Sequence, residues 1–541
     1  MSTASPPLPD MSSAIAMMLR GGREALNLGS FDLAETLGRE VLTYDSANAE
    51  AHVILGRALF YTKKYPQAVE HLAAGLSPAK QPEVWIELAR GHQTLFQWSK
   101  AISAFETAYT LKPPTALQEA ELGHAFSNNK QFALAVAAFA RAAALDATSP
   151  EIWIDLGAAQ LELGELEASL RSFESALQLK PDNHQALSNV VLVYEVMQDA
   201  AGALATADRL VATKPTDPAM LQKRGVVRLS RGQLVSGWTD YRARLSNPAH
   251  KGWHVGIPKP MWDGVSSLSD KGVLVWSDQG LGDQILTASL LPDALAAAKN
   301  VLFSCEPRLA ALIQRSFPGA RTVSLFDVPF GRADLSESDV QASISELGPA
   351  FRPDVAHFPK HTGYLKADPA KVAELKARYA ALPGQGPIVG LSWRSSHDVA
   401  GEHKSVSLEH WARVLKTPGV RFVSLQYGNA TADIAASGAN IFVDPNVNAM
   451  QDVDLFAAQV AAMDVIISTS NTTVHMAGAL GVPTLCLTPF VEGRPWYWFV
   501  GHDVSPWYPS VRHIWQTQRR QWGDVMGRAA TSLREMIESK Q

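Results

Sequence analysis

The first half of the chain repeats one pattern of large apolar and small residues about every 34 positions. Each copy holds two stretches in which apolar residues return at helical spacing, separated by a short polar turn. Two copies show the shared offsets best, with Trp85, Leu88, Ala89, Phe105 and Pro113 in one and Trp153, Leu156, Gly157, Phe173 and Pro181 in the other. The small residues let two helices approach closely, and the proline ends the second helix. About seven copies over residues 15–245 predict a solenoid of paired helices.

The helical period stops near residue 245, and residues 246–264 read as a Pro/Gly-rich linker. Apolar runs then alternate with helical stretches, first at 273–277, 301–305 and 321–325. This alternation predicts an α/β module of two doubly wound, Rossmann-like domains, over residues 265–365 and 385–515. A helix is expected at 369–382 between them, and a last one within 516–541.

One stretch in the second domain has the features of a ligand site. Residues 465–467 read as a buried strand and residues 472–480 as a short helix, with a polar turn between them. The turn holds Ser470, Asn471, Thr472 and Thr473, and unpaired N–H groups at such a helix start suit a phosphate. His475 lies one turn into the helix, as a phosphate donor or as a hydrogen-bonded core residue. Alternatively, Ser470 or Asn471 only caps the helix.

Composition narrows the classes of partner. The net charge of −5 and the pI of about 6.3 provide no basic field for nucleic acid or an anionic membrane. The only two cysteines, Cys305 and Cys486, stand in apolar runs, which indicates buried thiols in a reducing compartment. No apolar stretch is long enough to span a membrane, and we expect a cytoplasmic protein with no metal site.

Several motifs resemble, in order and spacing, those of the bacterial tetratricopeptide-repeat glycosyltransferases. They include WSDQGLGDQILTASLLPDA, GLSWRSSHDVAGEHKSVSLEHW, FVSLQYG and STSNTTVHMAGALGVPTLCLTP, and the match extends over residues 230–535. The resemblance implies a catalytic half similar to the heptosyltransferases, with the two-domain GT-B arrangement. Known members glycosylate proteins, and some modify flagellin. The heptosyltransferase-like pattern has Asp-Thr where this chain has Ser470 and Asn471.

The resemblance also assigns roles to residues at the cleft. Asp283, in the first turn after the glycines Gly280 and Gly282, is the candidate base that deprotonates an acceptor hydroxyl. Its alternative role is a favourable charge at a helix N-terminus. Arg394 and Lys404 are placed to neutralise the departing phosphate, or they are ordinary surface cations. Gln426 ends a strand and could contact the base or ribose, although a structural strand-end residue would look the same.

The solenoid offers a surface for the acceptor protein. The sixth place of successive repeats reads Glu87, Glu121, Asp155 and Asn189, an acidic stripe that either binds a polar or basic segment or is simply solvated. An aromatic run at residues 496–508 is expected to be a packed loop over the domain junction rather than a sugar platform.

We therefore expect a transferase that moves a sugar from a nucleotide-activated donor to Ser or Thr of a captured protein, with flagellin as the best candidate acceptor. No other cofactor is expected. The donor is a CMP-linked nonulosonic acid or a sugar on a nucleotide diphosphate. The alternatives are a scaffold whose transferase module is inactive, and a transferase for lipid-linked or free glycan.

Overall fold

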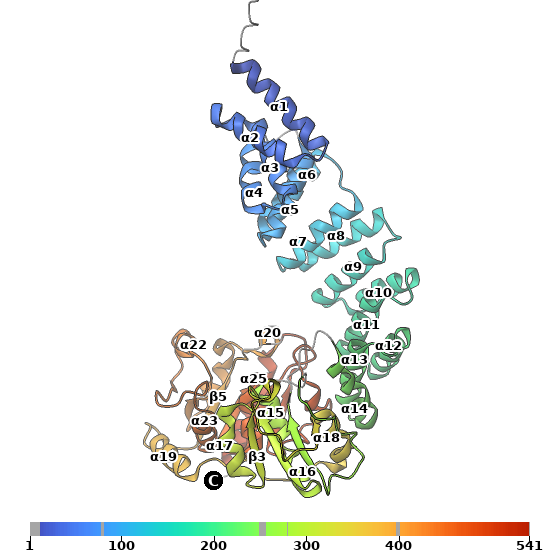
Figure 1. Ribbon diagram of the computed structural model, residues 1–541. Coiled ribbons are helices and arrows are strands. Elements are labelled where there is room, and N and C mark those ends of the chain that lie inside the picture. Colours follow the sequence, from blue (N-terminus) through green and yellow to red (C-terminus); the bar gives the residue numbers. More distant parts are fainter. Residues whose placement is uncertain (1–10, 77–80, 248–255, 278–279, 396–400, 540–541) are drawn as a thin grey trace, which may run out of the picture. The chain divides into compact units, whose positions relative to one another are not determined.

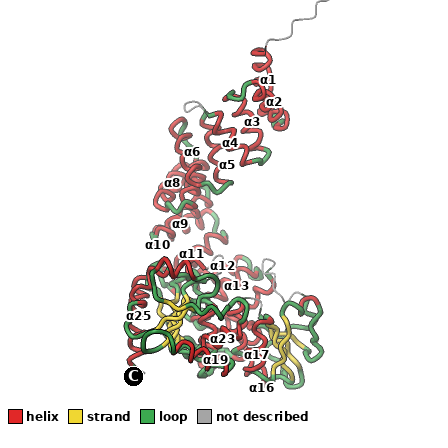
Figure 2. Tube along the Cα trace, turned by 90° about the vertical axis from the view of Figure 1, so that its left-hand side faces the viewer, coloured by secondary structure: helices red, strands yellow, loops and turns green. Residues whose placement is uncertain are grey.

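The computed structural model describes residues 11–76, 81–247, 256–277, 280–395 and 401–539. The chain divides into two compact units, one up to Val193 and the other from Tyr194 onward. Strands occur only in the second unit of the described chain, where they form two separate groups (Figure 2).

The first unit consists of helices that pack in antiparallel pairs (Figure 1). They are α1 (Met11–Asn27), α2 (Phe31–Tyr44), α3 (Ala49–Tyr61), α4 (Tyr65–Gly75), α5 (Pro82–Thr94), α6 (Trp98–Leu111), α7 (Ala116–Asn128), α8 (Phe132–Leu145), α9 (Pro150–Leu163) and α10 (Leu166–Leu179), and α11 (His184–Val196) crosses into the second unit. Small residues bring the pairs together as the repeat pattern predicts. A Cβ added at Gly123 would lie 2.7 Å from the Phe139 ring, and one at Gly157 would lie 2.8 Å from the Phe173 ring. Glycine is therefore needed where each phenylalanine crosses the first helix.

The second unit begins with three more helices, α12 (Ala200–Thr213), α13 (Pro218–Leu229) and α14 (Leu234–Arg242), and a 3-10 turn, η1 (Ala243–Ser246). These helices pack on the α/β part. Trp238 on α14 is fully buried, and its indole N–H donates to the carbonyl of Arg352 over 3.2 Å. The Trp238 and Trp496 rings lie 5.1 Å apart. The helices that end the repeat array thus share a core with the α/β module.

The first lobe of the α/β part is a parallel four-stranded sheet in the order β3-β2-β1-β4. Its elements are β1 (Gly272–Trp276), α15 (Leu281–Ala288), α16 (Leu291–Ala297), β2 (Asn300–Cys305), α17 (Pro307–Ser316), β3 (Ala320–Ser324), η2 (Val328–Phe330), β4 (Val340–Ala342), α18 (Ile344–Phe351) and η3 (Val355–His357). The strand order reverses between β1 and β4, which makes the carboxyl end of β1 the topological switch point of this sheet. Helix α19 (Pro369–Ala380) follows the lobe.

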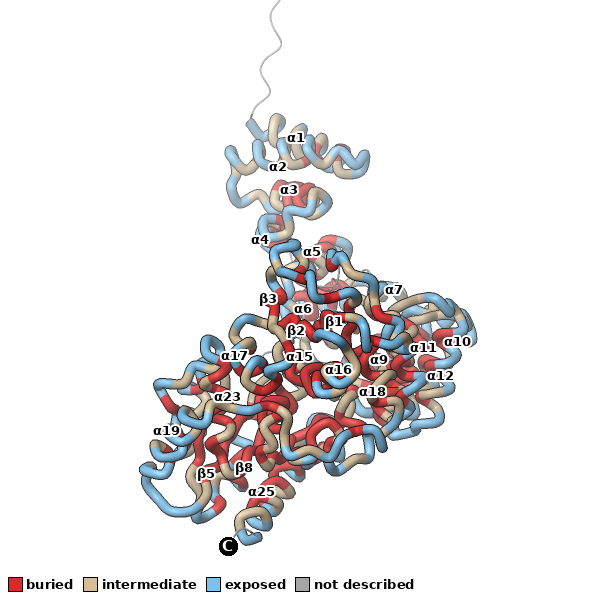
Figure 3. The backbone as a smooth tube through the Cα atoms, turned by 60° about the horizontal axis from the view of Figure 1, so that its bottom comes forward, coloured by how far each residue is buried: buried red, intermediate tan, exposed pale blue. Residues whose placement is uncertain are grey.

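The second lobe is a parallel six-stranded sheet in the order β10-β9-β8-β5-β6-β7. Its elements are β5 (Ile388–Ser392), α20 (Gly401–Lys404), η4 (Leu408–Trp411), α21 (Ala412–Leu415), β6 (Arg421–Ser424), α22 (Thr431–Ser437), β7 (Ile441–Phe442), α23 (Val453–Ala461), β8 (Val465–Thr469), α24 (Thr472–Ala479), β9 (Thr484–Thr488), η5 (Trp496–Trp498), β10 (Val511–Trp515) and α25 (Gly523–Glu538). The central strands β5 and β8 are buried along their whole length (Figure 3). The switch point lies between them.

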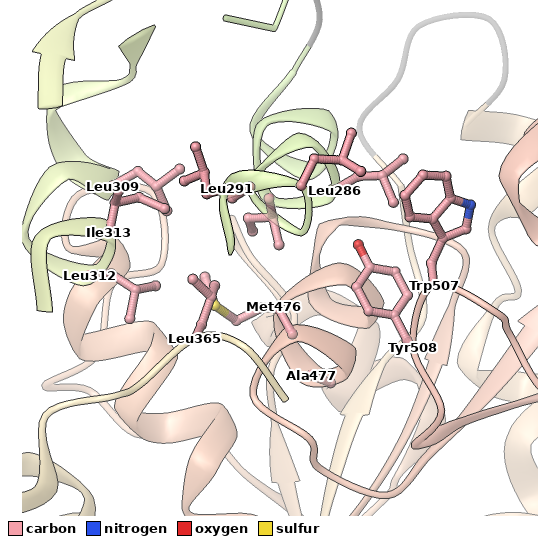
Figure 4. Packing of buried hydrophobic residues seen from close by; sticks show 14 of the residues in the cluster. Leu286, Leu291, Leu309, Leu312, Ile313, Leu365, Met476, Ala477, Trp507 and Tyr508 are labelled. Carbon is pink, nitrogen blue, oxygen red and sulfur yellow. The ribbon is translucent and has the colours of Figure 1, made fainter. Parts of the chain in front are cut away.

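One hydrophobic core joins the two lobes. Leu286 on α15 and Leu312 on α17 belong to the same buried cluster as Met476 and Tyr508 of the second lobe (Figure 4). Burying one such side chain contributes about 1.5–3 kcal/mol. The shared core therefore holds the lobes together as one unit.

Candidate functional site

Asp283 lies in the first turn of α15, at the switch point of the first sheet. Its backbone N–H donates to the carbonyl of Gly280 over 3.0 Å. The motif residues Asp278 and Gln279 lie outside the described residues. Neither glycine is in the left-handed region, since Gly280 has a φ of −66° and Gly282 is part of the helix. Gly282 is required for close approach instead: an added Cβ would lie 2.9 Å from Cδ2 of His475.

The polar turn before α24 is mostly occupied by the protein itself. Asn471 caps the helix, because its side-chain oxygen accepts from the Thr473 N–H at 2.9 Å. Its amide nitrogen donates to the Ser392 hydroxyl at 2.8 Å and to the Arg394 carbonyl at 2.9 Å, which ties β8 to β5 across the switch point. Ser470 accepts the indole N–H of Trp498 at 2.8 Å. Ser470 and Asn471 therefore shape the turn.

The two threonines differ from these residues. Thr472 is half-buried at the first helical position. Thr473 is fully buried, and its hydroxyl has no hydrogen-bond partner among the described residues. Of the four polar residues of the turn, Thr472 is the one that is not buried.

Gln426 has the role of a structural residue at the end of a strand, which was the alternative to a contact with the base or ribose. Its side-chain oxygen accepts from the N–H groups of Trp393 and Arg394, at 2.9 and 2.8 Å, and the residue is buried. These bonds fix the backbone that follows β5. Gln426 thus places Arg394 and does not need a ligand to satisfy it.

The two candidate cations have different surroundings. The Arg394 guanidinium pairs with Asp433 at 3.0 Å and donates to the Asn429 carbonyl at 2.9 Å. Lys404 is half-buried at the end of α20, and burial lowers its pKa while Asp283 opposes that shift. No hydrogen-bonded carboxylate holds its ammonium among the described residues. Lys404 is therefore within electrostatic reach of Asp283, whereas the Arg394 guanidinium is paired with Asp433.

His475 is buried inside the site. Its Nδ1 lies 2.8 Å from the Tyr508 hydroxyl and its Nε2 lies 3.1 Å from the Tyr497 hydroxyl. Its ring stacks on Trp498 with centroids 5.3 Å apart. Burial, together with the charge of Lys404, lowers the pKa of His475 to about 3, so the ring is neutral. Both nitrogens are already used, and the phosphate-donor interpretation of His475 does not fit this geometry.

Sequence reasoning missed the hydroxyls of Tyr497 and Tyr508. The aromatic run containing them forms a packed loop, as predicted, and Trp496, Trp498 and Trp507 are buried. The Asp283 charge contributes to raising the pKa of both tyrosines, after burial as the main cause. The hydroxyl on an aromatic ring is the only signal that the sequence offers for such a role.

The acidic stripe of the solenoid is paired with bases. Glu87 accepts from the Arg57 guanidinium at 2.8 Å, Glu121 from Arg90 at 3.0 Å, and Asp155 lies 3.0 Å from His124 Nε2. Each base occupies the ninth place of the preceding repeat. Asn189 is half-buried on α11.

This acid–base ladder, made of the pairs 57–87, 90–121 and 124–155, links neighbouring repeats. Glu87 is only 5% exposed, so it is not a solvated side chain. The carboxylates do not present a row of unpaired negative charge to a partner, and their regular spacing reflects repeat stacking.

Comparisons with known proteins agree with this architecture. The tetratricopeptide repeat family matches residues 19–82, 120–184 and 154–218, and the repeats are thereby confirmed. A solved tetratricopeptide protein, YrrB, described as having an unusual peptide-binding site, is 18% identical, with a TM-score of 0.30 over 33% of this chain and 92% of its own.

Among the described residues no helix is long and apolar enough to cross a membrane, and no three His, Cys, Asp or Glu side chains gather as metal ligands.

Two proteins share sequence with the chain. Anaphase-promoting complex subunit 3 of Schizosaccharomyces pombe is 25% identical over 128 residues, which cover 24% of this chain and 19% of that protein. Protein FlbA of Caulobacter vibrioides is 31% identical over 569 aligned positions, which cover 92% of this chain and 94% of FlbA. The alignment thus includes the repeats and both lobes, and the chain belongs to the family of FlbA.

Proposed function

We propose that the chain is a glycosyltransferase of the GT-B arrangement, which moves a sugar from a nucleotide-activated donor to Ser or Thr of a protein held by the repeats. Flagellin is the acceptor that we favour. The kinship with FlbA supports a flagellum-related role. We place the reaction in the cytoplasm, in keeping with the two buried free thiols.

One observation carries the proposal. The helices that start at the two switch points, α15 and α24, pack on each other, with Gly282 against His475. Asp283 follows the first switch point, and its charge acts on Lys404 of the opposite lobe. Ligands of doubly wound sheets bind at such switch points. A base and a cation that meet there are the two groups that sugar transfer from a phosphate requires.

The chemistry follows from those two groups. Asp283 takes the proton of the acceptor hydroxyl as its oxygen bonds to the anomeric carbon. The bond from that carbon to the phosphate oxygen breaks, and the phosphate leaves with the electron pair. Lys404 offsets the charge that develops on the phosphate. The donor is a CMP-linked nonulosonic acid or a sugar on a nucleotide diphosphate.

The deciding experiment compares the intact mass of flagellin from cells that carry wild-type protein, Asp283→Asn or Asp270→Asn. Asp270 is an exposed carboxylate of the same lobe and serves as the control. Loss of general-base catalysis lowers rates on the order of 10²- to 10⁴-fold, so Asp283→Asn should yield flagellin without the sugar mass. The melting temperature should stay near that of wild type, since a helix-dipole contribution is only about 0.3–1 kcal/mol.

The rival functions give other masses. A scaffold with an inactive module predicts that Asp283→Asn leaves the flagellin mass unchanged while deletion of the whole chain alters it. A transferase for lipid-linked or free glycan predicts the same flagellin mass in every strain.

A further inference from the structure

The His475 ring supports the turn of α15 that carries Asp283. If Gly282 had a Cβ, that atom would lie 2.9 Å from Cδ2 and 3.4 Å from Nε2 of His475. Helix backbone and imidazole edge are thus in direct contact, one residue before Asp283. A side chain at position 282 would push α15 away from α24.

Tyr364 makes a second contact with α15, on the other side of Asp283. The Tyr364 hydroxyl donates to the carbonyl of Ile285 over 2.7 Å. The backbone N–H of Tyr364 donates to the carbonyl of Ala479, at the end of α24, also over 2.7 Å. Tyr364 therefore links α15 to α24, as His475 does.

Tyr508 lies between these two contacts. Its ring centroid lies 6.3 Å from that of Tyr364, and its hydroxyl lies 2.8 Å from Nδ1 of His475. The Tyr497 hydroxyl lies 3.1 Å from Nε2, and a neutral imidazole donates from one of these two nitrogens and accepts at the other. We call Tyr497, His475, Tyr508 and Tyr364 the tyrosine–histidine relay.

We propose that His475 is a positioning residue for Asp283, and that the tyrosine–histidine relay fixes the imidazole against Gly282 and so places the carboxylate at the cleft. The ring has no free nitrogen for a ligand, and its edge faces the α15 backbone. A catalytic group must be held within a fraction of an ångström of its working geometry. The consequence for turnover rests on the proposed function, whereas the placement of α15 does not.

The test compares His475→Leu with His513→Leu. Leucine keeps most of the volume and removes both ring nitrogens. His513 is an equally buried histidine of the second lobe, which contacts the Thr488 hydroxyl at 2.9 Å and the Trp498 ring. Both changes should lower the melting temperature. Only His475→Leu should speed hydrogen exchange at the amides of residues 281–286.

Turnover per folded molecule provides the second measurement. A displaced catalytic group costs on the order of 10²-fold, and we expect such a loss in His475→Leu but less than about twofold in His513→Leu. In an Asp283→Asn background, His475→Leu should cost almost nothing further, because both changes disable one unit. If His475→Leu does not fold, His475→Gln, which keeps a polar group at the Nε2 position, undergoes the same measurements.

The two proposals fail in different ways. If the wild-type protein transfers no sugar, the proposed function is wrong, and the exchange rates of α15 still decide the placement. If transfer occurs while the His475 and His513 variants show equal exchange in α15 and equal turnover, His475 does not position Asp283.

Discussion

Asp283 and Lys404 act on each other electrostatically, and the charge of Lys404 also acts on the buried, neutral ring of His475. Burial lowers the pKa of Lys404, and the negative charge of Asp283 opposes that shift. The cation therefore depends on a carboxylate from the other lobe. An anionic donor bound beside Lys404 would favour the protonated amine further.

The different pairing of the two cations predicts different effects on nucleotide affinity. Lys404→Met should weaken binding of the nucleotide product by about 1.5–3 kcal/mol, the usual contribution of a desolvated charge-assisted contact. Arg394→Met should weaken it less, because the guanidinium already pairs with Asp433. Calorimetry of both variants measures the difference. Equal losses would place the phosphate between the two cations.

The loss of the Lys404 proton predicts a pH dependence of nucleotide affinity. Because burial lowers the pKa of Lys404, its ammonium loses the proton at a lower alkaline pH than an exposed lysine does. Nucleotide affinity should fall in that range for wild-type protein and stay flat for Lys404→Met.

The sequence indicated Asp283, Lys404 and His475 as candidate site residues, but not the partners of the His475 ring. Helix and strand periodicity set the start of α24, and the polar turn indicated its cap. The ring partners Tyr497 and Tyr508 stand 22 and 33 residues from His475 and approach it only through the packing of the aromatic loop. Such tertiary contacts leave no local pattern.

At the scale of elements, most strands followed the apolar runs that predicted them. The runs at 273–277, 301–305 and 465–467 correspond to β1, β2 and β8. The strands β4 and β7 were not predicted, because three and two residues are too few to show a period. They exist through pairing with β1 and β6. The sequence pattern indicated only the acids of the acid–base ladder, and the bases at the ninth place of each preceding repeat were not predicted.

The ladder predicts that Glu87 matters for the stability of the solenoid. Glu87→Gln leaves the Arg57 guanidinium without its carboxylate in a nearly buried site, which should cost about 1–3 kcal/mol. Glu83→Gln is the control, since Glu83 pairs with Lys112 at an exposed site and should cost less than about 1 kcal/mol. Urea unfolding of the full chain, followed by helical circular dichroism, compares the two. Equal midpoints would show that the ladder is only a surface feature.

The second lobe should be sensitive to acid. His475 and His513 both have a pKa lowered to about 3 by burial, against about 6.5 in the unfolded chain. Between these values the unfolded state binds more protons, so stability rises with pH and is lost as pH falls from about 6.5 toward 3. Each histidine contributes up to about 1.4 kcal/mol per pH unit in that window.

Unfolding midpoints at pH 7 and pH 5 measure this contribution. His513→Leu should lower the midpoint at pH 7 and flatten its pH dependence. A wild-type slope retained in His513→Leu would mean that other groups cause the acid sensitivity.

At the scale of the whole molecule, the compact units do not divide where the repeat pattern ends. The helices α12, α13 and α14 belong to the unit that contains both lobes. Glu195, at the end of α11, accepts from Arg494 over 2.9 Å and also pairs with Arg231. The hydrophobic period could not reveal this, because it records that a helix has an apolar face but not which surface covers it.

This division predicts the behaviour of fragments. A fragment that begins at residue 253 loses Trp238 and uncovers Trp496, and it should be unstable or aggregate. A fragment that begins at residue 181 keeps these contacts, and it should fold and bind nucleotide without modifying the acceptor protein. Melting curves and nucleotide calorimetry on both fragments check this. A stable fragment from residue 253 would contradict the role of Trp238.

The burial of Trp238 also determines where the chain can be joined to part of a related protein in a chimera. In arrays of this kind each repeat is stabilised by its neighbours in the stack, so repeats upstream of α11 should be exchangeable as modules. The α13–α14 pair must come from the same parent protein as the two lobes. Under the proposed function, a chimera intended to redirect transfer to another acceptor protein should therefore be joined before residue 181, with every helix after that point taken from the parent of the two lobes.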